Sequence, residues 1–232
     1  MNHSNFKNKI KAVLFDFGGT IDSDGMNWKD RFYPIYKSYG VPWSKEEFDQ
    51  YFYYADDTLV ERTLRKLGFK KTLHLQVSLV LKKGGLFSES LKNKIANKFL
   101  QDSLKTIKRN VLLFKKFKGQ YHLGIVSNFY GNLEVICKEL DLTQYFKSIA
   151  DSARVGALKP SEKIFFHVLN HFKCKPSEAL FVGDSLSRDM QGAKNMGMGH
   201  IWLRHKVYNK IKPCCKKDKI ITSLMELEDI LL

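Results

Sequence analysis

Four short polar segments of the chain carry residue types that can handle a phosphate group and a metal ion. They are FDFGGT at 15–20, VSN at 126–128, the Lys159-Pro160 pair, and VGDSLSRD at 182–189. Three of them follow short apolar runs, and the Lys-Pro pair stands just before a predicted helix. If the apolar runs are parallel strands of one sheet, all four segments lie at its carboxyl edge and form one site.

The first segment offers a nucleophile. Asp16 follows four apolar residues, so its carboxylate is expected to emerge from the sheet edge into a cleft. A carboxylate in that place can attack phosphorus and form an aspartyl-phosphate. Gly18 and Gly19 let the backbone turn tightly and approach a ligand closely. Asp16 is therefore the candidate catalytic nucleophile.

The other segments offer metal ligands, positive charge and hydrogen bonds. Asp184 and Asp189 supply hard oxygens, and Mg²⁺ prefers a few carboxylates together with phosphate oxygens and water. A metal ion and Lys159 would screen the repulsion between an anionic nucleophile and an anionic phosphate. Ser127 and Asn128, with the N–H groups that follow them, could hold the phosphate oxygens. The set predicts a magnesium-dependent phosphate-transfer site.

Each segment also has an ordinary structural explanation when it is taken alone. A carboxylate after a strand often caps a helix, and a Ser-Asn pair in that place is common turn chemistry. GDSLSRD could simply begin the helix that runs to Met196. Four such segments in order, each at the end of a predicted strand, are much harder to explain by structure alone, which favours a functional site.

The elements that must position these residues alternate along the chain. Short apolar runs predict buried strands, and stretches with apolar residues at helical spacing lie between them. This alternation predicts an α/β fold with a Rossmann-like, doubly wound parallel sheet. The predicted strands are 12–15, 123–126, 179–182, 200–203 and a possible short one at 220–221; the predicted helices are 132–140, 161–172 and one capped by Ser223.

The region between the first and second predicted strands has a different composition. It is rich in aromatic residues and lysine, and it shows helical spacing, as in Phe48, Tyr51 and Phe52. We interpret it as a mostly helical cap inserted after the first strand. The predicted core domain is 1–23 together with 111–232, and the predicted cap domain is 24–110.

Charge and apolar patterning narrow the class of protein. The formal net charge is +15, but the lysines are spread over the whole chain. We therefore favour general solubility over a nucleic-acid surface, although such a field would also attract anionic substrates. No apolar run is long enough to span a bilayer, and the first residues lack the apolar stretch of a signal peptide, so the expected location is the cytoplasm.

The four cysteines do not form a recognisable metal or disulfide pattern. None belongs to a C-x-x-C pair, and reduced structural thiols are the simplest interpretation. A zinc site of Cys214, Cys215 and His205 is conceivable, but its spacing matches no established zinc pattern.

The four polar segments together resemble the signature motifs of the haloacid dehalogenase-like hydrolase superfamily. FDFGGT resembles the first motif, IVSN the second, the lysine of LKPSEKIF the third, and VGDSLSRDMQGAKNMG the fourth. The predicted cap is similar to that of the phosphoglycolate phosphatase and β-phosphoglucomutase-like branch. The resemblance covers most of the chain and implies a phosphatase-type hydrolase.

The resemblance also implies roles for individual residues. Asp16 would be the nucleophile, with Lys159 completing the catalytic pair. Mg²⁺ would be bound by Asp16, the Gly18 carbonyl group and Asp184, with the help of Asp189. The expected substrate ligands are Thr20, Ser127, Asn128 and Lys159. The partner would be a small phosphorylated metabolite whose identity the sequence does not reveal.

One position departs from the family pattern. The family usually has a second aspartate, a general acid and base, two residues after the nucleophile, and here that residue is Gly18. Such acid–base help contributes about 10²–10⁴-fold to the rate. Asp22, or Asp56 or Asp57 of the cap, could take its place. Restoring the acid with Gly18→Asp is expected to raise turnover if the rest of the site is intact.

Three functions are compatible with a glycine in place of the second aspartate at position 18. We favour a phosphatase, slower than usual or restricted to esters with good leaving groups. A dehalogenase-type carbon–halogen hydrolase also lacks the second aspartate, but that branch needs no metal, and the pair Asp184 and Asp189 argues against it. A non-catalytic protein that binds phosphate or an effector is the third alternative, because a fold does not fix a function.

Overall fold

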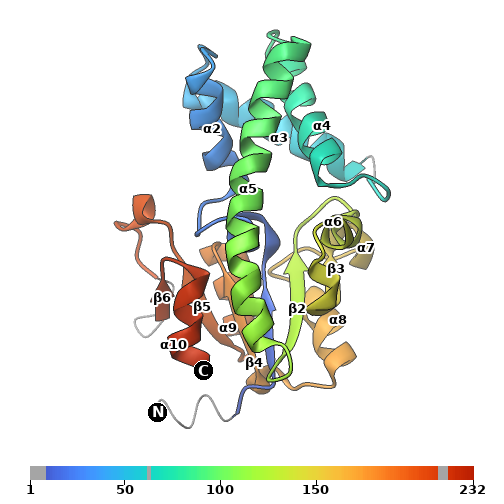
Figure 1. Cartoon of the computed structure of the whole chain (residues 1–232), viewed down its shortest axis with the longest axis vertical. Helices are drawn as coiled ribbons and strands as arrows, with labels where there is room; N and C mark the ends of the chain where they lie inside the picture. Colours follow the sequence, from blue (N-terminus) through green and yellow to red (C-terminus); the bar gives the residue numbers. More distant parts are fainter. Residues whose placement is uncertain (1–8, 62–63, 214–218) are drawn as a thin grey trace.

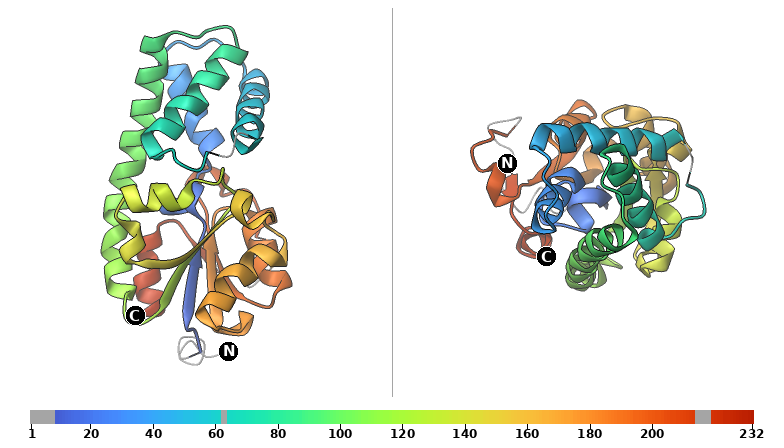
Figure 2. Two further views of the ribbon diagram at one scale, coloured as in Figure 1. Left: turned by 90° about the vertical axis from the view of Figure 1, so that its right-hand side faces the viewer. Right: turned by 90° about the horizontal axis from the view of Figure 1, so that it is seen from above.

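The protein consists of a six-stranded parallel sheet with helices on both faces and a helical cap above one edge (Figures 1 and 2). The computed structural model describes residues 9–61, 64–213 and 219–232. The strand order is β3-β2-β1-β4-β5-β6. The strands are β1 Ala12–Phe15, β2 His122–Ser127, β3 Phe146–Asp151, β4 Ala179–Gly183, β5 Gly199–Leu203 and β6 Lys219–Ile221.

The two faces of the sheet pack against different helices because side chains alternate along each strand. Val13 and Phe15 of β1 belong to the apolar cluster that includes the second half of α5. Ala12 and Leu14 belong to the cluster on the opposite face, with α8. The core helices are α6 Leu133–Glu139, α7 Ser152–Val155, α8 Glu162–Phe172, α9 Gln191–Asn195 and α10 Leu227–Leu231.

The predicted α/β class, parallel sheet and helical cap are confirmed. The predicted strands fall within β1, β2, β4, β5 and β6 to within about one residue, and the predicted helices correspond to α6, α8 and α10. Sequence patterning missed β3, whose sequence FKSIAD contains only two large apolar residues. This strand lies at the edge of the sheet, where half-polar sequences are tolerated.

In the described part of the chain, the cap is formed by α2, α3, α4 and the first half of α5. The last of these, α5, is continuous for 29 residues and runs from the cap down into the core (Figure 1). The predicted boundary at residues 110 and 111 falls inside it, and the division into two domains stays a prediction. The helices are α2 Trp28–Ser38, α3 Lys45–Glu61, α4 Phe69–Lys83 and α5 Glu89–Phe117.

Buried aromatic rings on α5 contact both the core and the cap. Phe114 on its lower half contacts Phe15 of β1, with 5.5 Å between ring centroids, and Phe146 of β3 at 4.8 Å. Phe99 on its upper half stacks on Phe32 of α2 at 3.9 Å. The helix therefore fixes the cap above the carboxyl edge of the sheet.

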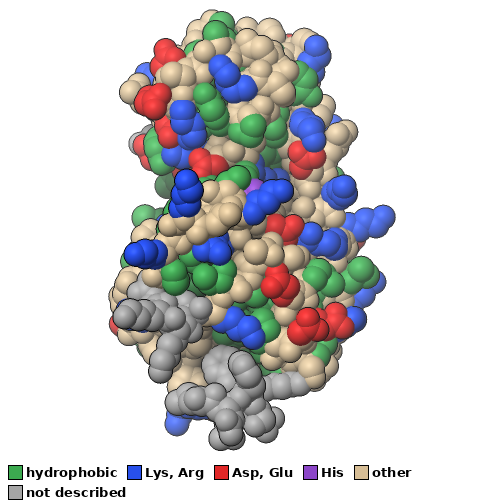
Figure 3. All heavy atoms as spheres, turned by 90° about the vertical axis from the view of Figure 1, so that its left-hand side faces the viewer, with side chains coloured by type: hydrophobic (Ala, Val, Ile, Leu, Met, Phe, Trp, Pro, Cys, Tyr) green, Lys and Arg blue, Asp and Glu red, His purple; other side chains and the backbone are tan. Residues whose placement is uncertain are grey.

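Among the described residues, no helix has the length and apolar character needed to cross a membrane. On the face drawn in Figure 3, lysine and arginine side chains are spread over both the cap and the core, with acidic side chains between them. Cys214 and Cys215, considered above with His205 as zinc ligands, lie outside the described residues.

Candidate active site

The strand ends bring the first polar residues of the predicted site together. Phe15 pairs with Ile125 of β2 on one side and with Val182 of β4 on the other. Because these strands are parallel, the next residues along each of them lie at the same edge of the sheet. Asp16 follows β1, Ser127 ends β2, and Asp184 follows β4.

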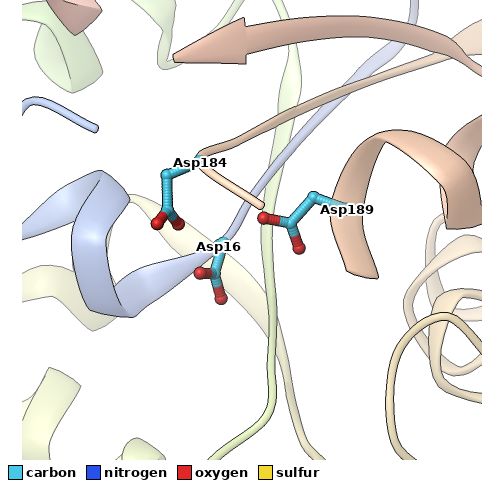
Figure 4. Close-up of side chains that lie close together, drawn as sticks. All are labelled: Asp16, Asp184 and Asp189. Carbon is cyan, nitrogen blue, oxygen red and sulfur yellow. The ribbon is translucent and has the colours of Figure 1, made fainter. Parts of the chain in front are cut away.

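Three carboxylates converge at this edge. Asp16, Asp184 and Asp189 each offer an oxygen, and these oxygens all lie within 4.8 Å of one another (Figure 4). Opposite oxygen ligands in a Mg²⁺ octahedron are separated by roughly 4.2 Å, so small adjustments would bring the three onto one ion. The donor set consists of hard oxygens and fits a divalent cation such as Mg²⁺.

A buried lysine connects two of these carboxylates. Lys159 Nζ lies 2.7 Å from Asp16 Oδ1 and 2.6 Å from Asp189 Oδ1, and the side chain is almost fully buried. Burial alone would lower the pKa of Lys159, but the two negative charges outweigh burial and hold the pKa above its ordinary value. Lys159 is therefore charged at neutral pH.

Asn128 holds the backbone of this lysine in place. The Lys159 backbone N–H donates to Asn128 Oδ1 at 2.7 Å, and Asn128 Nδ2 donates to the Lys159 carbonyl at 3.3 Å. The two bonds fix the loop before α8, which otherwise has no regular structure to hold it. Asn128, expected to contact phosphate, thus also positions the lysine, although it lines the same pocket.

The cluster carries excess negative charge. Burial, together with the charges of Asp16 and Asp189, raises the pKa of Asp184 well above its ordinary value. Burial also raises the pKa of Asp189, although Lys159 opposes that shift. Ionising all three carboxyl groups in a buried site costs free energy, because the like charges lie close together. A bound cation would remove this repulsion, which is a second reason to expect one here.

Local backbone and hydroxyl groups complete the carboxylate arrangement. Gly19 adopts φ +94°, and a Cβ built there would lie 2.7 Å from Asp184 Oδ2, so only glycine fits. Ser127 Oγ donates to Asp16 Oδ1 at 2.7 Å. Thr20, expected among the substrate ligands, is fully buried and donates to Asp184 Oδ1 at 3.3 Å. Its hydroxyl group supports a carboxylate and does not line the pocket.

The carboxyl edge forms one wall of a pocket of about 290 Å³, and the cap forms the other. The core wall includes Asp16, Ser127 and Lys159. The cap wall is defined here as Trp28, Lys29, Phe52, Tyr53 and Asp56. The sequence names Asp56 as a candidate acid, but it does not bring these five residues together.

Sequence reasoning missed several other residues of this pocket. Arg188 lines it from the segment that carries Asp189, and its place inside the fourth motif was a signal that could have identified it. Tyr130 follows the second motif by two residues. Trp28 lies in the first cap helix, where an aromatic residue has no distinguishing signal in a segment rich in aromatics.

Comparison with known proteins identifies the family. A family model described as haloacid dehalogenase-like hydrolase matches residues 13–203, which is most of the chain. The chain belongs to the haloacid dehalogenase-like hydrolase family. The match spans Asp16, Lys159 and the pair Asp184 and Asp189.

Relatives of this family member include named phosphatases. The chain is 37% identical to glyceraldehyde 3-phosphate phosphatase of Pyrococcus furiosus over 127 residues, 53% of this chain and 52% of that protein. It is 31% identical to pyrimidine 5'-nucleotidase YjjG of Escherichia coli over 124 residues, 52% of this chain and 54% of that protein. The chain thus matches about half the length of each of these relatives.

Solved structures support the fold over nearly the whole chain. The hydrolase YfnB of Bacillus subtilis, solved bound to magnesium, has a TM-score of 0.57 and 22% identity. The match covers 96% of this chain and 98% of that chain. At this identity the likeness establishes the shared fold of core and cap.

Proposed function

We propose that this protein is a Mg²⁺-dependent phosphatase that hydrolyses small phosphate monoesters through an aspartyl-phosphate on Asp16. The observation that carries the proposal is the buried contact of Asp16 with Lys159 beside two further carboxylates. A carboxylate held next to an ammonium group and a candidate cation site can approach an anionic phosphate without prohibitive repulsion. The named phosphatases among the relatives support the same reaction class.

Each residue of the core wall has a role in this reaction. Asp16 attacks phosphorus, a P–O bond to Asp16 forms, and the bond to the ester oxygen breaks. Lys159 and Ser127, which both donate to Asp16 Oδ1, hold the carboxylate in one orientation and can turn to the phosphate oxygens when the bond forms. Water then attacks the aspartyl-phosphate and releases inorganic phosphate.

Mg²⁺ would be held by Asp16, Asp184, the Gly18 carbonyl group and, directly or through water, Asp189. When bound, it supplies positive charge that stabilises the charge developing on the phosphate. Magnesium in the solved structure of YfnB is consistent with this assignment.

The relatives differ in the organic part of their substrates, a triose phosphate in one case and a nucleotide in the other. A pocket of about 290 Å³ limits the substrate to a small molecule. We therefore propose a phosphate monoester of a small alcohol, which excess positive charge on the protein would attract.

The test is phosphate release from a panel of phosphorylated metabolites, with Mg²⁺ and with EDTA. We expect release with Mg²⁺, none with EDTA, and loss of activity in Asp16→Asn, since the amide cannot act as the nucleophile. Asp57→Asn, which changes an exposed carboxylate, is the matched control and should keep activity.

Two other outcomes would replace the proposal. No turnover on a broad panel with Mg²⁺ present would indicate a phosphate-binding protein without catalysis. Release of halide from a haloacid in EDTA would indicate carbon–halogen hydrolysis.

A further inference from the structure

The place of the missing acid at position 18 is occupied by a tryptophan. A Cβ built on Gly18 would lie 3.2 Å from Trp28 Nε1 and 3.4 Å from its Cδ1. The indole ring cannot easily move aside, because Nε1 donates to Asp22 Oδ2 at 2.8 Å and the ring packs against Phe99 and Phe129. A side chain at position 18 would therefore have to displace this held ring by a few tenths of an ångström. Because residue 18 is glycine, a proton donor for the leaving group must come from elsewhere.

Asp22 cannot be that donor. It is fully buried and accepts from the Gly19 backbone N–H at 2.7 Å and from Trp28 Nε1. It also accepts from Arg31 Nη1 at 2.7 Å and from Ser103 Oγ at 3.3 Å. Asp22 is thus engaged by four donors, one of them charged, and it does not line the pocket. Asp22 anchors the cap to the core.

A proton donor for the leaving group must line the pocket, and Asp56 does so whereas Asp22 and Asp57 do not. It lies on α3 and lines the same pocket as Asp16, whereas its neighbour Asp57 is exposed and does not line the pocket. The buried hydroxyl group of Tyr130 donates to Asp56 Oδ1. This contact orients the carboxyl group from the core side, so that its second oxygen is left for a ligand in the pocket.

The surroundings of Asp56 suit a proton donor. Burial raises its pKa, and the nearby charge of Asp57 acts in the same direction. The hydrogen bond from Tyr130 and the positive charge of Arg188, across the pocket, oppose the rise without cancelling it. An ordinary surface aspartate is almost entirely ionised at neutral pH, and a raised pKa increases the protonated fraction that can donate.

We propose that Asp56, supplied by the cap, is the general acid and base of this site in place of the residue absent at position 18. The inference rests on the proposed phosphatase function. As Asp16 attacks and the phosphorus–ester oxygen bond breaks, the Asp56 carboxyl group gives its proton to the leaving alkoxide. The resulting carboxylate then takes a proton from the water that attacks the aspartyl-phosphate. The products are the alcohol, phosphate and both side chains in their starting forms.

The experiment compares two esters in Asp56→Asn. Nitrophenolate leaves readily without a proton, while an alkoxide does not, so only the alkyl ester depends on an acid. We expect Asp56→Asn to lower kcat for glycerol 2-phosphate, or the best alkyl ester of the panel, by about 10²-fold or more. On p-nitrophenyl phosphate we expect the rate of nitrophenolate release in the first turnover, which precedes the attack of water, to change by less than about threefold. Glu46→Gln, which changes an exposed carboxylate at the start of α3, is the matched control and should change neither.

Either of two results would overturn the proposal. One is an equal loss in the first-turnover release of alcohol and of nitrophenolate, which indicates a structural role. The other is no loss on the alkyl ester. If wild-type protein releases phosphate while Asp56→Asn does so equally well, only this inference fails. If wild-type protein hydrolyses neither ester, the proposed function fails with it.

Tyr130→Phe provides an independent check that keeps Asp56 itself. Removing the hydroxyl group removes a donor that opposes the raised pKa of Asp56. Activity on the alkyl ester falls as pH rises through the pKa of the acid, and this fall is the basic limb of the pH–rate profile. We expect the basic limb to move to higher pH in Tyr130→Phe. A limb that stays in place, or that also persists in Asp56→Asn, would contradict the assignment.

Discussion

The two walls of the pocket are built in different ways. On the core wall, Ser127 and Lys159 each contact Asp16 at 2.7 Å, and the three residues come from the ends of strands or the loop before α8. On the cap wall, aromatic side chains predominate, and Asp56 is its carboxyl group. The core wall is polar and closely hydrogen-bonded, while the cap wall is mostly aromatic, with one lysine and one aspartate.

The two walls are therefore suited to different parts of a phosphate monoester. Every phosphate monoester presents the same phosphoryl group, which a rigid set of charges on strand ends can hold in one geometry. The organic part varies among phosphate monoesters, and in the proposed reaction it would face the cap wall, which comes from separate helices. The cap wall is also where the proposed proton donor lies, next to the leaving group that needs it.

The largest expected effect lies on the core wall. Lys159→Met removes the ammonium group between Asp16 and Asp189, and we expect kcat to fall by about 10²–10³-fold, as when one electrostatic donor is removed from a reaction site. Both aryl and alkyl esters should lose activity equally, because the phosphoryl group is common to them. Steady-state rates with saturating Mg²⁺ measure this.

The matched control is Lys163→Met, which removes an exposed lysine at the start of α8. It should leave activity within about twofold, because exposed charges contribute little. If Lys159→Met discriminated between aryl and alkyl esters, the division between the two walls would be wrong.

A smaller effect is expected from substitution of Gly18, which lies next to Trp28 of the cap wall. Gly18→Asp was expected from sequence to raise turnover, but the structure places the Trp28 ring 3.2 Å from the new Cβ. We now expect it to destabilise the fold by about 1–3 kcal/mol through overpacking and not to increase kcat. For a chain of this size each kcal/mol lowers Tm by about 2–4 °C, which thermal unfolding can measure.

Gly18→Ala serves as the control, because it adds the Cβ without a charge. It should lower Tm by a similar amount if the contact with Trp28 is the cause. A gain in turnover in Gly18→Asp would show that the ring can move, and would weaken the case for Asp56.

Most of the core wall could be predicted from sequence because its residues follow buried strands within short motifs. Asp16 and Asp184 each stand directly after an apolar run, and parallel strands bring such residues to one edge. Thr20 shows the limit of this argument, since sequence placed it near the site but could not tell that its hydroxyl group faces Asp184.

Apart from Asp56, which the sequence offered as one of three candidate acids, the cap wall could not be predicted. Helical spacing does not reveal which face of a helix lines a pocket. Trp28 and Asp56 lie on α2 and α3, and they reach one pocket only through the packing of the cap on the core. Similarly, β3 was missed because its burial depends on neighbours distant in sequence.

The measurement that tests the central claim most directly is capture of the phosphoryl group on the protein. Wild-type protein with Mg²⁺ is mixed with a substrate labelled in its phosphate and quenched in acid. The account predicts a label on the peptide that contains Asp16, released by hydroxylamine as expected for an acyl phosphate, and absent from Asp16→Asn. Labelling that persists in Asp16→Asn, or rapid turnover with no labelled peptide at any time, would contradict it.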